Sequence, residues 1–319
     1  MNRVFRNVLL CASILASTAA FAQTPVQTRQ VGTATLENVP QIPAEVKESV
    51  QRYQNYREAI FRDWLPDGSM LITTRFGATS QVHRVAAPGA DRTQITFFDE
   101  PVADAETIPG TSRFLLQRDT GGNEWFQLYA MGLAGQPVQL TEPGTRNQGY
   151  GFSKDGKLLA WARAVKGSGD YAILTADPAN PASRRVAFQG KGAIGVADIS
   201  ADKSRVLLER NISNRETRLA LLSLATGQAA ELPWTSDPAR YEEAGFTPDG
   251  KGFLAITDYQ NDFRRLVEID LASGKRSVLT PGLNWDVETY ELSYDGRFIA
   301  YSVNEGGFSR LSLVHRSTG

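Results

Sequence analysis

Two short strings of this chain combine residue types that could bind a ligand. A tyrosine is followed by Glu242 and Glu243, and paired carboxylates can hold an ammonium group through charge-assisted hydrogen bonds. In the string 121–129, a Gly-Gly turn precedes Glu124 and Trp125, and we expect these two side chains to project from a loop at the rim of the fold. Glu124, Trp125, Glu242 and Glu243 are therefore the candidate substrate-gating or amine-anchoring residues.

Each string also has a plainer structural interpretation. Glu242 and Glu243 come just before a turn, and the matching positions of the following repeat carry acidic residues within 286–288, which is typical of ordinary strand residues. Glu124 and Trp125 could simply pack a loop onto a neighbouring element. Both interpretations stay open at the level of the sequence.

The residue patterns that catalysis by an activated nucleophile requires are missing. The sequence has two histidines, His83 and His315, one cysteine, Cys11, and no G-x-S-x-G, H-E-x-x-H or Gly-rich phosphate-binding motif. Two histidines without carboxylates at matched positions do not predict a metal site. Both fall on predicted third strands of repeats, and we expect them to be surface or strand-packing residues. The sequence therefore predicts no catalytic residue, no metal site and no cofactor.

A repeated strand–turn–strand pattern must position the candidate residues. Six times, a hydrophobic run enters a tight polar turn and leaves it as a second hydrophobic run; the turns lie near residues 67, 110, 155, 202, 249 and 295. The clearest copies contain Asp-Gly, which favours a tight turn because glycine takes a positive φ at no steric cost. A period of about 45 residues is typical of a radial repeat fold.

Each repeat also contains patterns for two further strands. Third strands are predicted at 218–224 and 265–271, and a short fourth strand at 276–280. A β-sandwich also has short strands and turns, but it does not repeat the same turn at a constant interval. We therefore predict an all-β fold, a β-propeller of four-stranded antiparallel blades with six visible repeats over residues 56–319.

The sixth repeat is expected to be incomplete. Its strands are predicted near 289–292, 298–303 and 311–315, and no fourth strand follows. A propeller closes only when its last blade is completed and docked on the first. We interpret the sequence as the front part of a longer protein.

The N-terminal segment differs in composition from the repeats. Residues 1–22 combine two arginines, an apolar run over 8–20 and an A-x-A site ending at Ala22, which predicts a cleaved secretory signal peptide that is too short to span a membrane. The protein is therefore expected in the periplasm or outside the cell. Residues 23–55 are predicted to form an extension with a short helix that begins at Ala44.

Composition limits the partners of the chain. It carries 34 basic and 35 acidic residues, a net charge of −1, without a basic stripe. We therefore expect neither nucleic acid nor an anionic membrane as a partner. The sole cysteine lies in the predicted signal peptide, so the mature chain is expected to have no disulfide and no thiol nucleophile.

Several strings resemble the N-terminal propeller of exported bacterial serine peptidases of the prolyl oligopeptidase family, the acylaminoacyl and dipeptidyl peptidases. The resemblance covers essentially the whole mature chain, and its most specific parts are Thr-Arg-Phe-Gly and Gly-Gly-x-Glu in this order. The strings that carry it are 52–57, 74–77, 94–101, 121–129, 285–288 and 303–307.

The resemblance implies a propeller that caps a C-terminal α/β-hydrolase domain in the same chain and admits short peptides. The serine, aspartate and histidine of such enzymes lie in that second domain, and no position of this sequence matches them. Relatives of the dipeptidyl peptidase type anchor a substrate amine with a Tyr-flanked glutamate pair, which corresponds to Glu242 and Glu243 here.

The alternative is a stand-alone periplasmic propeller of the TolB type that binds other proteins. The Asp-Gly repeat alone is shared by both groups. TolB-like proteins carry an α/β domain before the propeller, whereas only residues 23–55 precede the repeats here. This difference favours the peptidase propeller.

Overall fold

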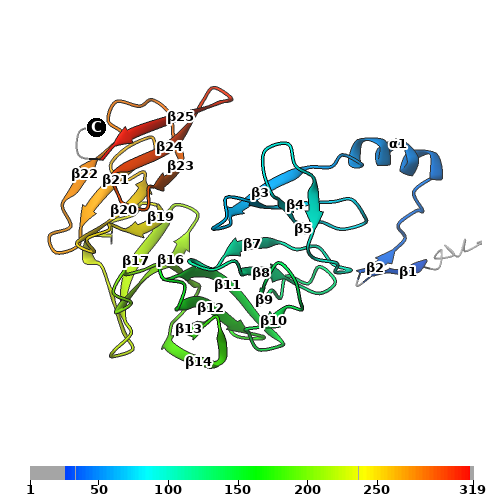
Figure 1. Cartoon of the computed structure of the whole chain (residues 1–319), viewed down its shortest axis with the longest axis horizontal. Helices are drawn as coiled ribbons and strands as arrows, with labels where there is room; N and C mark the ends of the chain where they lie inside the picture. The colour runs from blue at the N-terminus through cyan, green and yellow to red at the C-terminus, as the bar shows by residue number, and fades with distance from the viewer. Residues whose placement is uncertain (1–25, 33, 236, 317–319) are drawn as a thin grey trace, which may run out of the picture. The chain divides into compact units, whose positions relative to one another are not determined.

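The computed structural model describes residues 26–32, 34–235 and 237–316 (Figure 1). The chain divides into two compact units, residues 1–55 and 56–319, and the predicted signal peptide lies outside the described residues. The first unit holds an antiparallel hairpin, β1 (Thr28–Val31) and β2 (Ala34–Glu37), which we did not predict, and the helix α1 (Ala44–Gln54).

The second unit is a six-bladed β-propeller, which confirms the predicted fold class. Its six antiparallel sheets succeed one another along the chain, and each is built from consecutive strands in sequence order (Figure 1). The first three sheets consist of β3 (Ala59–Trp64), β4 (Met70–Thr74), β5 (Gln81–Val85) and β6 (Arg92–Gln94); β7 (Asp104–Thr107), β8 (Phe114–Arg118), β9 (Gln127–Met131) and β10 (Val138–Gln139); and β11 (Thr145–Phe152), β12 (Leu159–Val165), β13 (Tyr171–Asp177) and β14 (Asn180–Gln189).

The fourth and fifth sheets also have four strands, and the sixth has three among the described residues. A short 3₁₀ helix, η1 (Pro233–Thr235), connects the fourth sheet to the fifth. The strands of these sheets are β15 (Ile194–Ile199), β16 (Arg205–Ser213), β17 (Glu216–Ser223) and β18 (Gln228–Glu231); β19 (Tyr241–Phe246), β20 (Gly252–Thr257), β21 (Arg265–Asp270) and β22 (Arg276–Val278); and β23 (Val287–Leu292), β24 (Phe298–Glu305) and β25 (Phe308–His315).

The turns that contain Asp-Gly, in the first, third, fifth and sixth blades, have the chemistry that this dipeptide predicts. In the fifth blade, the Thr247 hydroxyl donates to Asp249 Oδ1 at 2.7 Å, and the Gly250 N–H donates to the Thr247 carbonyl at 2.8 Å. Gly250 has a φ of 65°, a conformation that costs glycine little. The carboxylate thus stabilises the turn through residues that lie within a few positions of each other.

Neighbouring turns also contact each other, so they lie on one face of the propeller. A Cβ atom added at Gly156 would lie 2.2 Å from the Pro109 carbonyl oxygen of the preceding blade. Lys203 pairs with Asp155 at 2.5 Å, and the Arg205 guanidinium donates to the Gly250 carbonyl at 3.2 Å. Glycine is therefore required at position 156 by both its φ of 67° and the close approach of the neighbouring backbone.

Apolar side chains fill each of the five seams between consecutive sheets. Each seam is packed by a cluster with members from both sheets. At the seam between the second and third sheets, Leu115 and Leu128 pack with Trp161, all fully buried. The Trp161 indole N–H donates to Asn147 Oδ1 at 3.0 Å, as a buried indole usually requires.

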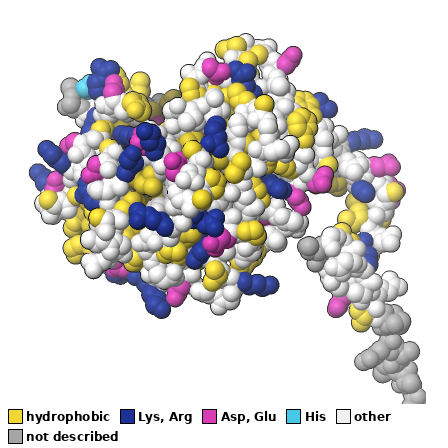
Figure 2. Space-filling view, turned by 60° about the horizontal axis from the view of Figure 1, so that its bottom comes forward, with side chains coloured by type: hydrophobic (Ala, Val, Ile, Leu, Met, Phe, Trp, Pro, Cys, Tyr) yellow, Lys and Arg dark blue, Asp and Glu magenta, His cyan; other side chains and the backbone are white. Residues whose placement is uncertain are grey.

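The surface carries charges of both signs. On the face shown in Figure 2, lysine and arginine side chains alternate with aspartate and glutamate, and no large area has a single sign. Among the described residues, no helix is long and apolar enough to cross a lipid bilayer.

Candidate functional site

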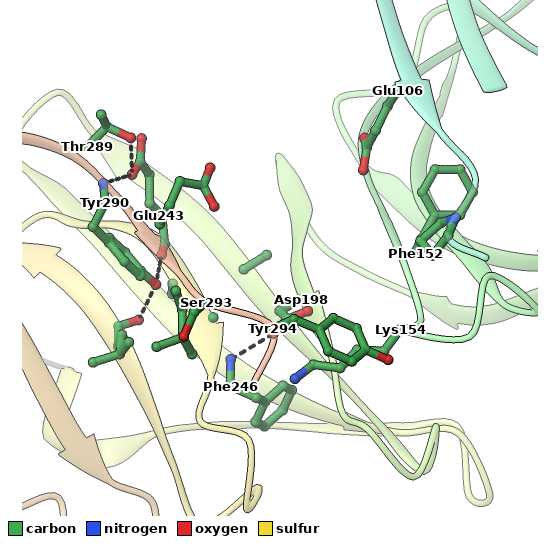
Figure 3. Close-up of a pocket in the computed structure, with 17 residues that line it drawn as sticks. Glu106, Phe152, Lys154, Asp198, Glu243, Phe246, Thr289, Tyr290, Ser293 and Tyr294 are labelled. Carbon is green, nitrogen blue, oxygen red and sulfur yellow. Dashed lines mark hydrogen bonds between the residues drawn. The ribbon is translucent and has the colours of Figure 1, made fainter. Parts of the chain in front are cut away.

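The inner strands of the propeller surround a central cavity of about 570 Å³ (Figure 3). Residues of blades two to six line it, and the largest contributions come from the strands β19 and β23 and the turn that follows β23. A cavity of this volume is in the range that binds small ligands. Its lining combines carboxylates with aromatic rings: Glu106, Asp198, Glu243 and Glu291 with Phe152, Phe246, Tyr290 and Tyr294.

Three of these carboxylates occupy one position of the repeat. This position lies two residues before the first residue of each turn, and four of the six inner strands place a carboxylate there. Glycine occupies it in the other two. Since side chains alternate between the faces of a strand, equivalent positions in the six blades point the same way. The six residues are Asp63, Glu106, Gly151, Asp198, Gly245 and Glu291.

A β-bulge precedes this position in five of the six inner strands. In β15, for example, the register shifts between Val196 and Asp198, and in β19 between Glu242 and Gly245. The strands β3, β11 and β23 carry the same irregularity. Bulges bend a strand and re-aim its side chains, and they are common beside functional sites. Here they determine which inner-strand side chains reach the cavity.

Two of the four carboxylates tie neighbouring blades together. Asp198 accepts a hydrogen bond from the Ile199 N–H at 2.7 Å and another from the Phe246 N–H, on the next blade, at 2.7 Å. Asp63 does the same between blades one and two, where the Thr107 N–H donates at 2.8 Å. Both oxygens of each aspartate are occupied, so these side chains stabilise the fold.

The two glutamates at this position behave differently. Within the part of the chain that the structure describes, the carboxylates of Glu106 and Glu291 accept no hydrogen bond and form no ion pair. Burial raises the pKa of Glu106 to about 8, and the negative charges of Asp63, Asp104 and Glu291 contribute to the increase. Burial also raises the pKa of Glu291, with Glu243 and Asp63 as further causes.

Glu243 is held at the cavity wall by the sixth blade. Its Oε2 accepts hydrogen bonds from the Thr289 hydroxyl at 3.0 Å and the Tyr290 N–H at 3.2 Å, and its backbone carbonyl accepts one from the Tyr290 hydroxyl at 2.7 Å (Figure 3). Glu243 has a φ of 51°, within the bulge of β19. Gly245 leaves room for the tyrosine, since a Cβ there would lie 3.3 Å from its hydroxyl.

One cation, Lys154, lines the cavity together with these four carboxylates. It lies on the side of Asp198 and Tyr294, away from Glu243 (Figure 3). Its charge lowers the pKa of Asp198, but burial is the larger effect, and the pKa of that aspartate is raised overall. The lining therefore has an excess of acidic groups.

The structure separates the two predicted glutamates of the Tyr-Glu-Glu string. Glu242 is part of an ion-pair network with Arg240 at 2.6 Å and Arg264 at 2.8 Å, and these two guanidinium groups help to hold the pKa of the carboxyl below its ordinary value although burial opposes them. Glu242 does not line the cavity, whereas Glu243 does. The two carboxylates therefore do not form a joint anchor in this structure.

Glu124 and Trp125 lie elsewhere in the propeller. The Glu124 carboxylate is exposed and reaches Arg146 at 3.6 Å, and its N–H donates to Asp119 at 2.7 Å. Trp125 is half-buried and lines a separate hollow of about 510 Å³ formed largely by residues of the second blade. The predicted residues thus fall at three different places, and only Glu243 reaches the central cavity.

Both histidines lie on third strands, as predicted. His83 is fully buried on β5, its Nδ1 lies 3.0 Å from the Gln81 carbonyl oxygen, and burial lowers its pKa. His315, on β25, packs edge-on against Phe298 with ring centroids 5.2 Å apart. Among the described residues, no group of histidine, cysteine, aspartate and glutamate side chains has the arrangement of a metal site.

No protein-family model matches the chain, and no curated protein matches it. Solved structures share its fold at low sequence identity. TolB from Acinetobacter baumannii has 23% identity and a TM-score of 0.53 over 66% of this chain. A structure from a study of two prolyl endopeptidases has 12% identity and a TM-score of 0.65 over 91%. An oligogalacturonate lyase from Vibrio parahaemolyticus has 11% identity and a TM-score of 0.62 over 82%.

The coverage of these proteins differs as well. The chain spans 53% of the TolB chain and 49% of the prolyl endopeptidase chain, about half of each, but 78% of the lyase. At these identities the likeness establishes the fold. The chain is thus a six-bladed β-propeller with an acidic central cavity, a fold that it shares with the TolB and prolyl endopeptidase structures.

Proposed function

We propose that this chain is the substrate-gating propeller of an exported serine peptidase of the prolyl oligopeptidase family. In this proposal the propeller admits and orients short peptides, and an α/β-hydrolase domain of the same protein, outside the sequence given, cleaves them. The observation that carries the proposal is the central cavity. It is large enough for part of a peptide and is lined by polar and aromatic side chains from five blades.

Two further observations support this function. The sequence strings that resemble the peptidase family extend across the whole mature chain, and the likeness to the prolyl endopeptidase structure extends over 91% of the chain. The cavity offers no hydroxyl–imidazole pair, because both histidines lie outside its lining. A serine activated by an imidazole would therefore have to come from outside this cavity.

The proposed location is the periplasm or the cell exterior. The support is the sequence of residues 1–22, with its positive start, short apolar run and A-x-A cleavage site after Ala22. A mature protein beginning at Gln23, detected by N-terminal sequencing, is the expected result. An unprocessed N-terminus in exported protein would contradict it.

A stand-alone TolB-like propeller that binds other proteins is the second candidate. It is favoured by the higher sequence identity to TolB, 23% against 12% for the prolyl endopeptidase. Its expected ligand would be a protein surface rather than a short peptide.

The nucleotide sequence downstream of the codon for Gly319 separates the two candidates. The peptidase proposal requires an open reading frame that continues and encodes a G-x-S-x-G elbow within about 250 residues, the size of one further domain. A stop codon directly after Gly319 in the intact gene would refute it and leave the TolB-like function.

A further inference from the structure

We propose that the central cavity selects ligands that carry a primary ammonium group on a flexible side chain, with Glu106 and Glu291 as its acceptors. For peptides, this means a preference for a lysine side chain over neutral or acidic ones. The claim that the ligands are peptides rests on the function proposed above. The role of the two glutamates as ammonium acceptors does not depend on that function.

The first step of the argument is the contrast between aspartate and glutamate at one position of the repeat. Asp63 and Asp198 use both carboxylate oxygens to bond backbone N–H groups of their own and the next blade. Glu106 and Glu291 occupy the same position with a side chain longer by one methylene, and both line the cavity. Among the described residues neither carboxylate has a partner, so both are available to a ligand.

The second step is that these two carboxylates interact with each other. The charge of Glu291 contributes to the raised pKa of Glu106, and that of Glu243 contributes to the raised pKa of Glu291. Glu106 is partly buried and Glu291 is exposed to the open cavity, and nearby like charges disfavour the ionised form of each carboxyl group. A ligand ammonium beside either carboxylate would replace part of this repulsion with a charge-assisted hydrogen bond.

Glu243 supplies a third acceptor on the opposite wall. Its Oε2 is fixed by Thr289 and Tyr290, while its Oε1 accepts none of the hydrogen bonds found between described residues. Figure 3 shows Glu106 and Glu243 on opposite sides of the cavity. A group that enters the cavity is therefore flanked by carboxylates from blades two, five and six.

The aromatic part of the lining suits an aliphatic stem. Phe152, Phe246 and Tyr294 border the cavity on the side of Lys154 (Figure 3). The methylene groups of a lysine side chain pack on such rings while its ammonium group remains with polar partners. Lys154 also repels a ligand ammonium locally, which favours placement toward Glu106 and Glu291 rather than toward Asp198.

Isothermal titration calorimetry at about pH 9 tests the inference, because Glu106 is then largely ionised while a lysine side chain keeps its charge. The chain is titrated with three N-acetylated, C-amidated tripeptides, Ala-Lys-Ala, Ala-Ala-Ala and Ala-Glu-Ala, and with spermidine, an amine without a peptide bond. Acetylation removes the terminal amine, so the lysine side chain is the only ammonium group of the peptides. The variants are Glu106→Gln, Glu291→Gln and the double variant, and the matched control is Glu231→Gln, on the outer strand β18.

We expect the lysine peptide to bind at least tenfold more tightly than the alanine peptide, and the glutamate peptide to bind most weakly. Each cavity variant should weaken binding of the lysine peptide about tenfold, as expected for one charge-assisted hydrogen bond in a partly solvated site. The control should bind like the parent, and added salt should weaken binding.

The possible failures are distinguishable. Equal binding of all three peptides would overturn the ammonium preference and leave the peptide-gating function standing. Binding of spermidine that depends on both glutamates, without binding of any peptide, would support the acceptor site and count against the peptide function. Absence of binding by all four compounds, or unchanged binding in the double variant, would overturn the inference itself.

Discussion

Replacing Glu106 by glutamine should remove a pH dependence from the stability of the propeller. The pKa of Glu106 rises from 4.5 to about 8 in the fold, first because the side chain is buried and then because of nearby carboxylates. The folded state therefore holds a proton that the unfolded chain releases. The contribution of this group to stability is intact below pH 4.5, declines as the pH rises, and is lost above about pH 8.

The magnitude follows from the shift. Each pKa unit corresponds to about 1.4 kcal/mol, so the full shift would correspond to on the order of 5 kcal/mol. Water in the open cavity and relaxation of the side chain reduce this value, and we expect roughly 2 kcal/mol. Glutamine is close in shape and cannot ionise. The Glu106→Gln variant should thus match the parent at low pH and exceed it in stability at alkaline pH.

Urea denaturation followed by circular dichroism at about pH 5 and about pH 9 measures the effect. Thermal unfolding should agree, with a melting temperature for Glu106→Gln higher by roughly 5 °C at the alkaline pH. Glu58→Gln controls for the loss of one negative charge, because Glu58 is exposed, lies outside the cavity lining and forms no ion pair among the described residues. If the parent and Glu106→Gln lose stability in parallel between the two pH values, Glu106 is not protonated in the fold and the reasoning is wrong.

Four further outcomes are expected. Gly156→Ala should destabilise the protein by roughly 2–4 kcal/mol, because a Cβ there meets the Pro109 carbonyl. Gly68→Ala, in the equivalent turn of the first blade with free space around it, should cost only about 1 kcal/mol. Equal losses of stability in urea denaturation would show that the neighbouring turn moves to make room for the added Cβ. The Ser200 hydroxyl and nearby N–H and hydroxyl groups lower the pKa of Asp202 to about 2. The contribution of Asp202 to stability is therefore present above pH 3.8 and is lost as the pH falls through about 2. Asp202→Asn should flatten the fall of stability at acid pH, and an unchanged fall would show that Asp202 does not stabilise the turn. Hydrogen exchange should be faster in β25, which pairs only with β24 among the described strands, than in β17, which is paired on both sides; equal protection would mean that another strand covers the outer edge of β25. A fluorophosphonate probe should not label the chain, since such a probe requires a serine activated by an adjacent base, and a labelled serine identified by mass spectrometry would reveal a nucleophile.

The fold could be predicted because its main determinants are local. The six polar turns and their nearly constant spacing define the first two strands of every blade, and the observed hairpins around Asp155, Asp202, Asp249 and Asp295 agree with them. A turn of this kind depends on residues within a few positions of each other. The hairpin formed by β1 and β2 was missed because its strands have four residues each and follow no repeat.

The candidate site was predictable only in part. Glu243 lines the cavity, but Glu242 is held by Arg264, which is 22 residues away along the chain, and pairing of this kind has no local pattern. The bulges of the inner strands depend on register with the neighbouring strand, and the sequence does not encode them in a recognisable motif. An alignment of the six repeats on their turns could have singled out Glu106 and Glu291, since it places them in one column.

The hydrogen bonds by which Asp63 and Asp198 connect neighbouring blades have a consequence for the exchange of blades within the protein. A hybrid in which the second blade replaces the fourth would put a glutamate at the place of Asp198, leave the Phe246 N–H without its carboxylate partner, and add another free acidic group to the axis of the propeller. The six repeats share one backbone arrangement, but one blade cannot replace another without losing these contacts. Recombination between them would have to preserve the order of aspartate, glutamate and glycine around the axis, because the residue at this position of each repeat determines whether the blade bonds to the next one.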